Sequence, residues 1–150
     1  MTLTLTTTKL TIARWRETVI FPDWKGIRLR AKLDTGARSS AIHAEEYEVI
    51  RHPSTAQRPV NEELRMKIKV GTKHFWVTAP ILEYRNVKNS GGKIEERPFI
   101  ETTLEMMGRH LPVVMSVTNR DKMRFPVLLG RTFLSGRFLV DPRDSVKDDE

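Results

Sequence analysis

Hydrophobic and polar residues alternate along most of this chain, which is the pattern of a β-strand with one buried face. The clearest run is 27–33, where apolar residues occupy every second position and basic residues lie between them. Other runs are rich in Val, Ile, Thr and aromatic residues, which favour strands. Together these patterns predict strands at residues 16–21, 27–33, 64–70, 74–82, 97–106, 111–117, 127–129 and 137–140.

Turn-forming residues separate the predicted strands. Glycine tolerates the backbone conformations that tight turns need, and it stands between the strands at positions 26, 71, 91, 92 and 108. Helix candidates are short, one at 132–135 and a single turn at 41–47. We therefore expect an all-β fold with one short helix, arranged as a sandwich or a partly closed barrel.

The length of the chain predicts one folding unit. With 150 residues it has the ordinary size of a single domain, and we place that domain at 14–144. Residues 1–13 alternate Thr with Leu at their start and are expected to form a strand or a tail. Residues 51–63 are polar and predict a loop, and residues 145–150 predict a frayed C-terminus.

Composition limits the chemistry. The chain has no cysteine, which excludes disulfides, thiolate metal sites and a cysteine nucleophile. No stretch approaches the roughly 20 apolar residues of a membrane helix, and no basic start precedes an apolar segment, so we expect a soluble, cytoplasmic protein. The net charge of +7 attracts anions in general. Without basic clusters interleaved with aromatic residues, nucleic acid is the less favoured partner.

The motif with the most chemical content is Asp34-Thr35-Gly36, directly after the strand predicted at 27–33. It places one carboxylate on a tight turn, as aspartic peptidases do with their catalytic acid. Such enzymes need two carboxylates that share one proton, and no other Asp here precedes Thr-Gly or Ser-Gly. The second carboxylate would then come from a second copy of the chain across a two-fold axis.

A second segment supports this interpretation, because the last apolar run of the sequence ends in Gly130-Arg131. The order of the two segments resembles the retropepsins, homodimeric aspartic peptidases of viral type, in which such a strand packs beneath the Asp-Thr-Gly loop. The resemblance implies a retropepsin-like barrel with one lobe per chain and with Asp34, Thr35 and Gly36 as catalytic residues. It gives Gly130 and Arg131 a structural role at the site.

Most of the chain is similar to one family. The stretches KLDTGARSSAIHAEE, RPFIETTLEM and TNRDKMRFPVLLGRTFLSGRFLVDP resemble bacterial and archaeal retropepsin-like proteins labelled ATP-dependent zinc proteases, the RimB-like aspartic peptidases. Members are associated with ATP-grasp glutamate ligases of the RimK type. The resemblance implies a homodimer, a glutamylated protein tail as substrate and a glutamate ligase as a partner.

The zinc and ATP in that label have no counterpart among the residues. The four His stand at 43, 52, 74 and 110, without HExxH or His-x-His spacing, and no Gly-rich loop ends in Gly-Lys-Ser or Gly-Lys-Thr. We therefore expect neither a metal nor another cofactor. Zinc-dependent hydrolysis is a third hypothesis that rests on the label alone.

In the expected site, two copies of Asp34 bind a water molecule between them. The resemblance implies that the Thr35 hydroxyl orients the loop across the dimer axis, and Gly36 is expected to supply backbone freedom. Retropepsins generally carry an Asp two residues after this glycine, where it pairs with the Arg of the closing strand. Here that position is Arg38, which leaves Arg131 without its usual partner.

Arg38 is also the best local indication of the substrate. An Arg beside the catalytic turn can bind a carboxylate through two N–H groups, which favours Asp or Glu in the substrate. The expected substrate-binding residues are Ala37, Arg38, Arg97 and Arg124. The hairpin expected at 86–96, with two glycines at its middle, is the candidate for a flap that covers the substrate.

Two functions from different classes follow. The first is a homodimeric aspartic peptidase that hydrolyses peptide bonds in acidic or glutamate-rich tails. The second is a non-catalytic dimeric β module that binds acidic peptides or a partner ligase. Replacing Asp34 with Asn distinguishes them, because the first function loses its catalytic carboxylate and the second does not depend on it.

Overall fold

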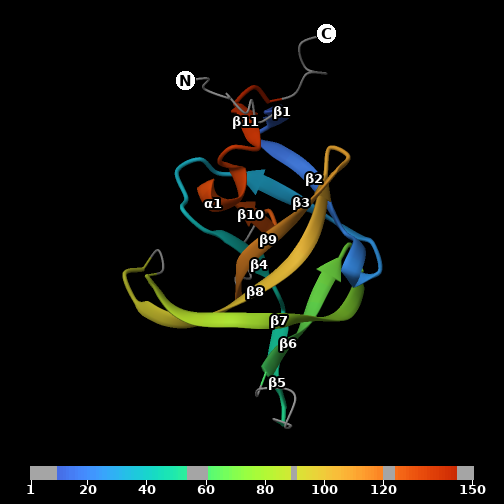
Figure 1. Cartoon of the computed structure of the whole chain (residues 1–150), viewed down its shortest axis with the longest axis vertical. Coiled ribbons are helices and arrows are strands. Elements are labelled where there is room, and N and C mark those ends of the chain that lie inside the picture. Colours follow the sequence, from blue (N-terminus) through green and yellow to red (C-terminus); the bar gives the residue numbers. More distant parts are fainter. Residues whose placement is uncertain (1–9, 54–60, 89–90, 120–123, 145–150) are drawn as a thin grey trace, which may run out of the picture.

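The chain forms a six-stranded β-barrel with a three-stranded extension (Figure 1). A computed structural model of the chain describes residues 10–53, 61–88, 91–119 and 124–144. The strands of the barrel, in their order around it, are β2 (Arg16–Phe21), β3 (Ile27–Leu33), β10 (Val127–Leu129), β4 (Ser40–His43), β9 (Arg109–Thr118) and β8 (Ile94–Met106). This is the expected all-β, retropepsin-like barrel.

The barrel closes where β2 meets β8. Among the described residues one pair, Ile20 with Glu105, joins these two strands, whereas β2 and β3 pair along the full length of β2. Beyond β8 the sheet continues as an antiparallel extension, with strands β7 (Lys73–Lys88), β6 (Asn61–Val70) and β5 (Glu46–His52). The extension ends in the open edge of β5.

A separate two-stranded sheet joins the two ends of the described chain. Strand β1 (Thr11–Arg14) pairs in parallel with β11 (Phe138–Asp141), at the top of Figure 1. Hydrogen bonds from the Arg143 side chain hold the pKa of Asp141 below its ordinary value. Beneath this sheet lies the helix α1 (Arg131–Leu134), which follows β10 directly.

Alternating burial explains why the barrel has one dominant core. In β3 every apolar residue is buried and every basic residue is exposed, as the sequence pattern predicts. The short 3₁₀-helix η1 (Pro22–Trp24) adds Trp24, which stacks on Phe21 with ring centroids 4.6 Å apart. The indole N–H of Trp24 donates to the Thr78 carbonyl at 3.0 Å and so ties η1 to β7.

The sequence located most strands correctly. Those expected at 16–21, 27–33 and 127–129 coincide with β2, β3 and β10, and the short helix is displaced by one residue. The helical turn expected at 41–47 is wrong, because this segment contains β4 and the start of β5. Pairing with β9, β10 and β6 outweighs the local preference of its Ala and Glu residues.

Parts of the expected loop and tails form strands. Strand β5 extends to His52 and β6 begins at Asn61, so the loop expected at 51–63 is shorter, and residues 54–60 lie outside the described residues. Residues 11–13 belong to β1, and the remaining expected tails, 1–9 and 145–150, also lie outside the description. In the described part of the chain, no helix has the length and apolar character to cross a membrane.

Trp24 provides a test of the core. We expect Trp24→Ala to lower the free energy of unfolding by about 3–5 kcal/mol, because the side chain is 1% exposed and its loss leaves a cavity. The control is Trp76→Ala, since Trp76 is 39% exposed and its loss should cost about 1 kcal/mol. Urea unfolding measures both values. Equal losses would contradict this description of the core.

Candidate active site

Asp34 lies where three strand ends meet. Strand β10 pairs in parallel with β3 and antiparallel with β4, so it separates two strands that are close in sequence. The chain between β3 and β4 therefore passes over the end of β10. Asp34 is half-buried at the start of this loop, whereas Thr35 and Gly36 are exposed. Asp34 is thus partly enclosed, at the base of a loop whose next two residues are exposed.

Three hydrogen bonds position Asp34. Its backbone N–H donates to the Leu129 carbonyl at 2.8 Å, and its carbonyl accepts from the Ala37 N–H at 3.2 Å. Its carboxylate oxygen Oδ1 accepts from the Gly36 N–H at 2.9 Å. Because one carboxylate oxygen is held by the loop's own backbone, the direction of the acid is set within the chain.

The start of α1 supports the loop from below. The first backbone N–H groups of a helix have no partner within the helix. Here the Arg131 N–H donates to the Ala37 carbonyl at 2.8 Å, and the Thr132 N–H donates to the Arg38 carbonyl at 3.0 Å. The helix start and the loop after β3 therefore satisfy each other's backbone groups.

Gly130 allows this close contact. A Cβ at this position would lie 2.6 Å from the Ser39 carbonyl oxygen and 2.9 Å from that of Ala37, which is shorter than real contacts. The Gly130 N–H donates to the Ser40 hydroxyl at 3.0 Å, and Ser40 is fully buried. The expected structural role of Gly130 therefore has a steric basis. Ser40 belongs to the same contact, although the sequence offered no motif that distinguished it from Ser39.

Gly36 is required for space rather than for backbone freedom. Gly36 is expected to supply backbone freedom and a close approach that a side chain would block, and of these the structure favours the second, because Gly36 is not among the glycines with positive φ. A Cβ at Gly36 would lie 3.2 Å from Asp34 Oδ1. A side chain here would crowd the carboxylate directly.

Arg131 has a partner that the sequence could not show. Its side-chain Nη1 donates to the Thr35 backbone carbonyl at 3.0 Å. In retropepsins the Arg of the closing strand usually pairs with an Asp, but the corresponding position here is Arg38. The main-chain oxygen of Thr35 is the acceptor for Arg131 instead. Backbone acceptors carry no sequence signal, which is why Arg131 remained without a partner in the sequence analysis.

The expected substrate-binding residues fall into two groups. Ala37 and Arg38 lie in the loop, and Arg38 is exposed. Arg97 is not brought to this loop: it is 6% exposed and forms an ion pair with Glu95. It lies three residues before Ile100, which is two strands away from Ser40 in the same row of paired residues, so it is displaced from that row by about 10 Å along β8 as well as by the width of two strands. This arrangement favours a structural role for Arg97.

Arg124 is part of a row of stacked cations and rings. Its guanidinium lies 5.8 Å from the centroid of Phe125, and this ring meets Trp15 edge-on at 5.8 Å. The guanidinium of Arg16 lies 5.0 Å from the centroid of the Trp15 ring. The Trp15 carbonyl accepts from the Leu33 N–H, so the row lies beside the end of β3, which directly precedes Asp34.

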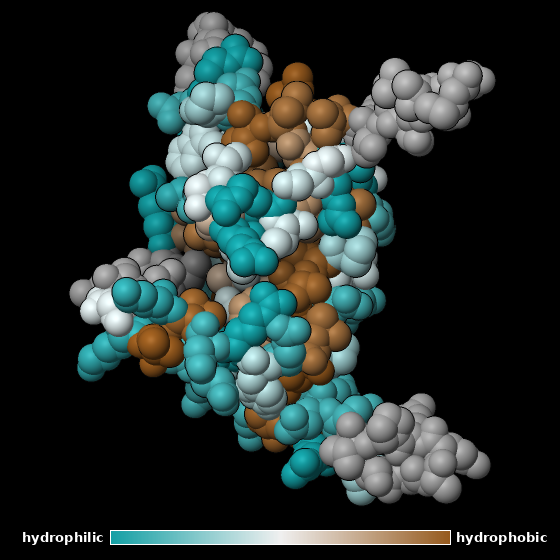
Figure 2. Space-filling view, turned by 60° about the vertical axis from the view of Figure 1, so that its left-hand side comes forward, coloured by the Kyte–Doolittle hydropathy of each residue, from teal (hydrophilic) through white to brown (hydrophobic). Residues whose placement is uncertain are grey.

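The hairpin expected at 86–96 is present. Strands β7 and β8 pair from Ile81 with Ile100 to Lys88 with Ile94, and residues 89–90 between them lie outside the described residues. In Figure 1 this hairpin and the loop after β3 project toward the same side of the molecule. Figure 2 turns that side forward and shows a largely hydrophilic surface with separate apolar patches. The role of the hairpin as a flap stays a prediction.

The described residues do not fit a zinc centre. They include no group of three or more His, Asp or Glu side chains that could hold a metal ion. Three of the four His each contact a Glu carboxylate: His52 contacts Glu63 at 2.6 Å, His74 contacts Glu45 at 3.0 Å and His110 contacts Glu105 at 3.4 Å. The zinc hypothesis therefore gains no support from the geometry.

The chain is similar in sequence to a known protein family and to part of several longer proteins. A family model described as RimB-like, "Retropepsin-like aspartic endopeptidase RimB", matches residues 12–149. Two curated relatives carry the name "Probable alpha-L-glutamate ligase". The one from Shewanella halifaxensis is 31% identical over 122 residues, and the one from Parasynechococcus marenigrum is 32% identical over 117 residues. Each match covers 78% of this chain and 25% of the relative, so the chain spans about a quarter of their length.

A solved structure has the same fold. The crystal structure of protein Lpg0085 from Legionella pneumophila, described as having unknown function, matches with a TM-score of 0.73 and 22% sequence identity. The match covers 89% of this chain and 95% of that one. At this identity the likeness concerns the fold alone.

The two site glycines should respond differently to substitution. We expect Gly130→Ala to lower the free energy of unfolding by about 1–3 kcal/mol, because its new methyl group meets backbone atoms that cannot move alone. Gly36→Ala meets a side-chain oxygen at an exposed position, so its effect should stay within about 1 kcal/mol. Urea unfolding of both variants measures the difference. A larger loss for Gly36→Ala would contradict the proposed contact.

Proposed function

The chain belongs to the RimB-like family of retropepsin-like aspartic endopeptidases, and on that basis we propose that it is a homodimeric aspartic peptidase that cleaves acidic, glutamate-rich peptides. One observation carries the proposal. The Asp34 carboxylate is oriented by the Gly36 N–H on a loop supported by Gly130 and Arg131.

The dimer follows from the number of acids. Asp34 is the single Asp in the sequence that precedes Thr-Gly or Ser-Gly, and one carboxylate cannot both remove a proton and donate one at the same moment. A two-fold axis beside the loop would supply the second copy. The exposed loop residues Thr35 and Gly36 leave room for this approach, and the Thr35 hydroxyl is the proposed contact across the axis.

Exposed apolar side chains offer a further contact for a second copy. On the β1–β11 sheet, Ile12 is 65% exposed and Leu139 is 53% exposed. Figure 2 shows an apolar patch at the corresponding end of the molecule. Apolar surface of this kind on a short sheet favours contact with another protein surface.

The proposed reaction is hydrolysis by a water molecule held between two Asp34 carboxylates. Like charges at hydrogen-bond distance favour a pair that shares one proton. The ionised carboxylate takes a proton from the water molecule while the oxygen of that water bonds to the peptide carbonyl carbon. The protonated carboxylate donates a hydrogen bond to the developing oxyanion. The C–N bond then breaks, and the amine leaves with the proton that the first carboxylate took up.

Two observations support an acidic substrate. Arg38 is exposed four residues after Asp34, and its guanidinium can bind a carboxylate through two N–H groups. The matched relatives named for alpha-L-glutamate ligation contain a segment similar to this chain within much longer proteins. An activity toward glutamate chains, with a ligase as partner, is consistent with that arrangement.

Subunit mixing tests the mechanism. We expect Asp34→Asn to abolish cleavage of an oligoglutamate-tailed peptide, read by mass spectrometry, while the fold and the dimer remain. When equal amounts of wild-type and Asp34→Asn chains are unfolded together and refolded, random pairing leaves about a quarter of the dimers fully wild type. Activity per total chain should then fall to about a quarter of the wild-type value.

The control mixes wild type with a folded variant that keeps the acid, Lys69→Gln, whose side chain is exposed on β6. This mixture should keep the full activity. A value near half in the Asp34→Asn mixture would show that each subunit works alone and would contradict the shared acid pair. Cleavage by Asp34→Asn at the wild-type rate would remove Asp34 from the mechanism.

Arg38 should determine substrate preference. We expect Arg38→Gln to lower kcat/KM for a glutamate peptide about fivefold, because an exposed charge contact contributes about 1 kcal/mol or less. The same variant should cleave a glutamine counterpart of the peptide as wild type does, since that substrate has no carboxylate to lose. Equal losses for both peptides would instead assign Arg38 to the support of the loop.

A further inference from the structure

The β2–β3 hairpin carries a row of basic side chains on the outside of the barrel. Arg28, Arg30 and Lys32 alternate with buried residues along β3, so all three point outward. Arg16 of β2 is the cross-strand partner of Lys32 and lies on the same face. We call Arg16, Arg28, Arg30 and Lys32 the outer basic face.

These four cations have no carboxylate partner among the described residues. Every ion pair that the described residues form with a carboxylate involves other basic side chains. Like charges on neighbouring strands destabilise a sheet unless something offsets them. Arg16 also donates to the Asp144 carbonyl at 3.2 Å, whereas Arg28, Arg30 and Lys32 form a row without a described carboxylate that is well suited to an anionic partner.

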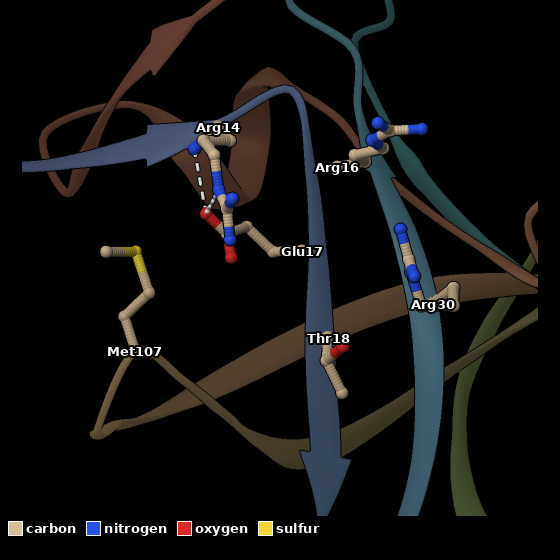
Figure 3. Close-up of a pocket in the computed structure, with 6 residues that line it drawn as sticks. All are labelled: Arg14, Arg16, Glu17, Thr18, Arg30 and Met107. Carbon is tan, nitrogen blue, oxygen red and sulfur yellow. Dashed lines mark hydrogen bonds and ion pairs between the residues drawn. The ribbon is translucent and has the colours of Figure 1, made fainter. Parts of the chain in front are cut away.

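The nearby acid does not neutralise this face. Glu17 accepts a hydrogen bond from the Arg14 backbone N–H at 2.8 Å, and its side chain is 11% exposed. In Figure 3, Arg14 and Glu17 lie on one side of β2, whereas Arg16 and Arg30 lie on the other side beside β3. A hollow of about 550 Å³ at this place is lined by Arg14, Arg16, Glu17, Thr18, Arg30 and Met107.

The spacing of the row matches an extended peptide. Lys32, Arg30 and Arg28 precede Asp34 by two, four and six residues, which corresponds to about 7, 13 and 20 Å along the strand. In an extended α-linked peptide, side chains on one face repeat at the same interval of about 7 Å. Every second glutamate of such a chain could therefore face one cation of the row, with the end of the chain at the Asp34 loop.

We propose that the outer basic face binds the distal part of an extended, α-linked glutamate chain whose other end occupies the Asp34 site. The inference rests on the proposed peptidase function and deepens it. The face adds affinity outside the catalytic loop and makes binding depend on the number of glutamates. Chains of two or three residues reach Lys32, whereas chains of about six residues also reach Arg28.

The neighbouring aromatic rings favour a peptide over a single-stranded nucleic acid. Binding of single strands usually relies on bases stacked on open ring faces. Here Arg16 covers Trp15 and Arg124 lies against Phe125, and the two rings meet each other edge-on. Each ring thus already contacts a cation of the chain and the other ring, so the row of N–H donors and charge is the larger feature that this face offers to a ligand.

The test measures binding separately from cleavage. In the Asp34→Asn background, fluorescence anisotropy gives the Kd of labelled α-linked oligoglutamate peptides of increasing length. We expect Arg28→Gln/Arg30→Gln to weaken binding of a long peptide about tenfold, because two exposed charge contacts are lost. The charge-matched control, Lys69→Gln/Lys73→Gln on the β6–β7 hairpin, should change it less than about twofold. Thermal unfolding verifies that both variants are folded.

Each outcome has one meaning. The proposal is supported if the affinity increases with peptide length up to about six glutamates and if this increase is absent in Arg28→Gln/Arg30→Gln. Equal weakening by the control pair would reduce the effect to net charge and overturn it, as would an RNA that displaces the peptide at lower concentration. Failure of the wild type to cleave any peptide would refute the peptidase function, yet the binding data would still decide whether the outer basic face holds the chain.

Discussion

The position of β10 between β3 and β4 is the constraint on which the site depends. It forces the chain after β3 to cross over the end of β10, and Asp34 stands at the start of that crossing. The crossing is tight, since the loop carbonyls accept from the first N–H groups of α1 and leave no space for a side chain at Gly130. A single topological feature thus fixes the backbone around the acid.

Local patterns in the sequence were sufficient wherever a strand has one buried face. The alternation at 27–33 identified β3 to the residue. The contact between the Asp-Thr-Gly loop and the later Gly-Arg segment was implied by the resemblance to retropepsins rather than by a local pattern. Local patterns failed at 41–47, where pairing with distant strands decides the structure. They also could not show that Arg97 is buried against Glu95, because its charge alone indicated an exposed residue.

The basic residues of the chain therefore have different roles that composition does not separate. Arg131 donates to a carbonyl of the loop after β3, and Arg97 is buried and paired with the more exposed Glu95. The cations of the outer basic face have no described carboxylate and stand in register along β3. Some of the basic residues behind the net charge of +7 thus stabilise the structure, and others form a row along β3 that ends next to Asp34.

The pairing of β3 with β10 also has a consequence for the order of assembly. Residues 31–33 meet residues 127–129, about a hundred positions later, and contacts of such long range form slowly because a large loop must close first. A nascent chain that has not yet reached β10 carries the acid without the scaffold that orients it. The scaffold that orients Asp34 is therefore complete only near the end of folding, after the last strand of the barrel has been made.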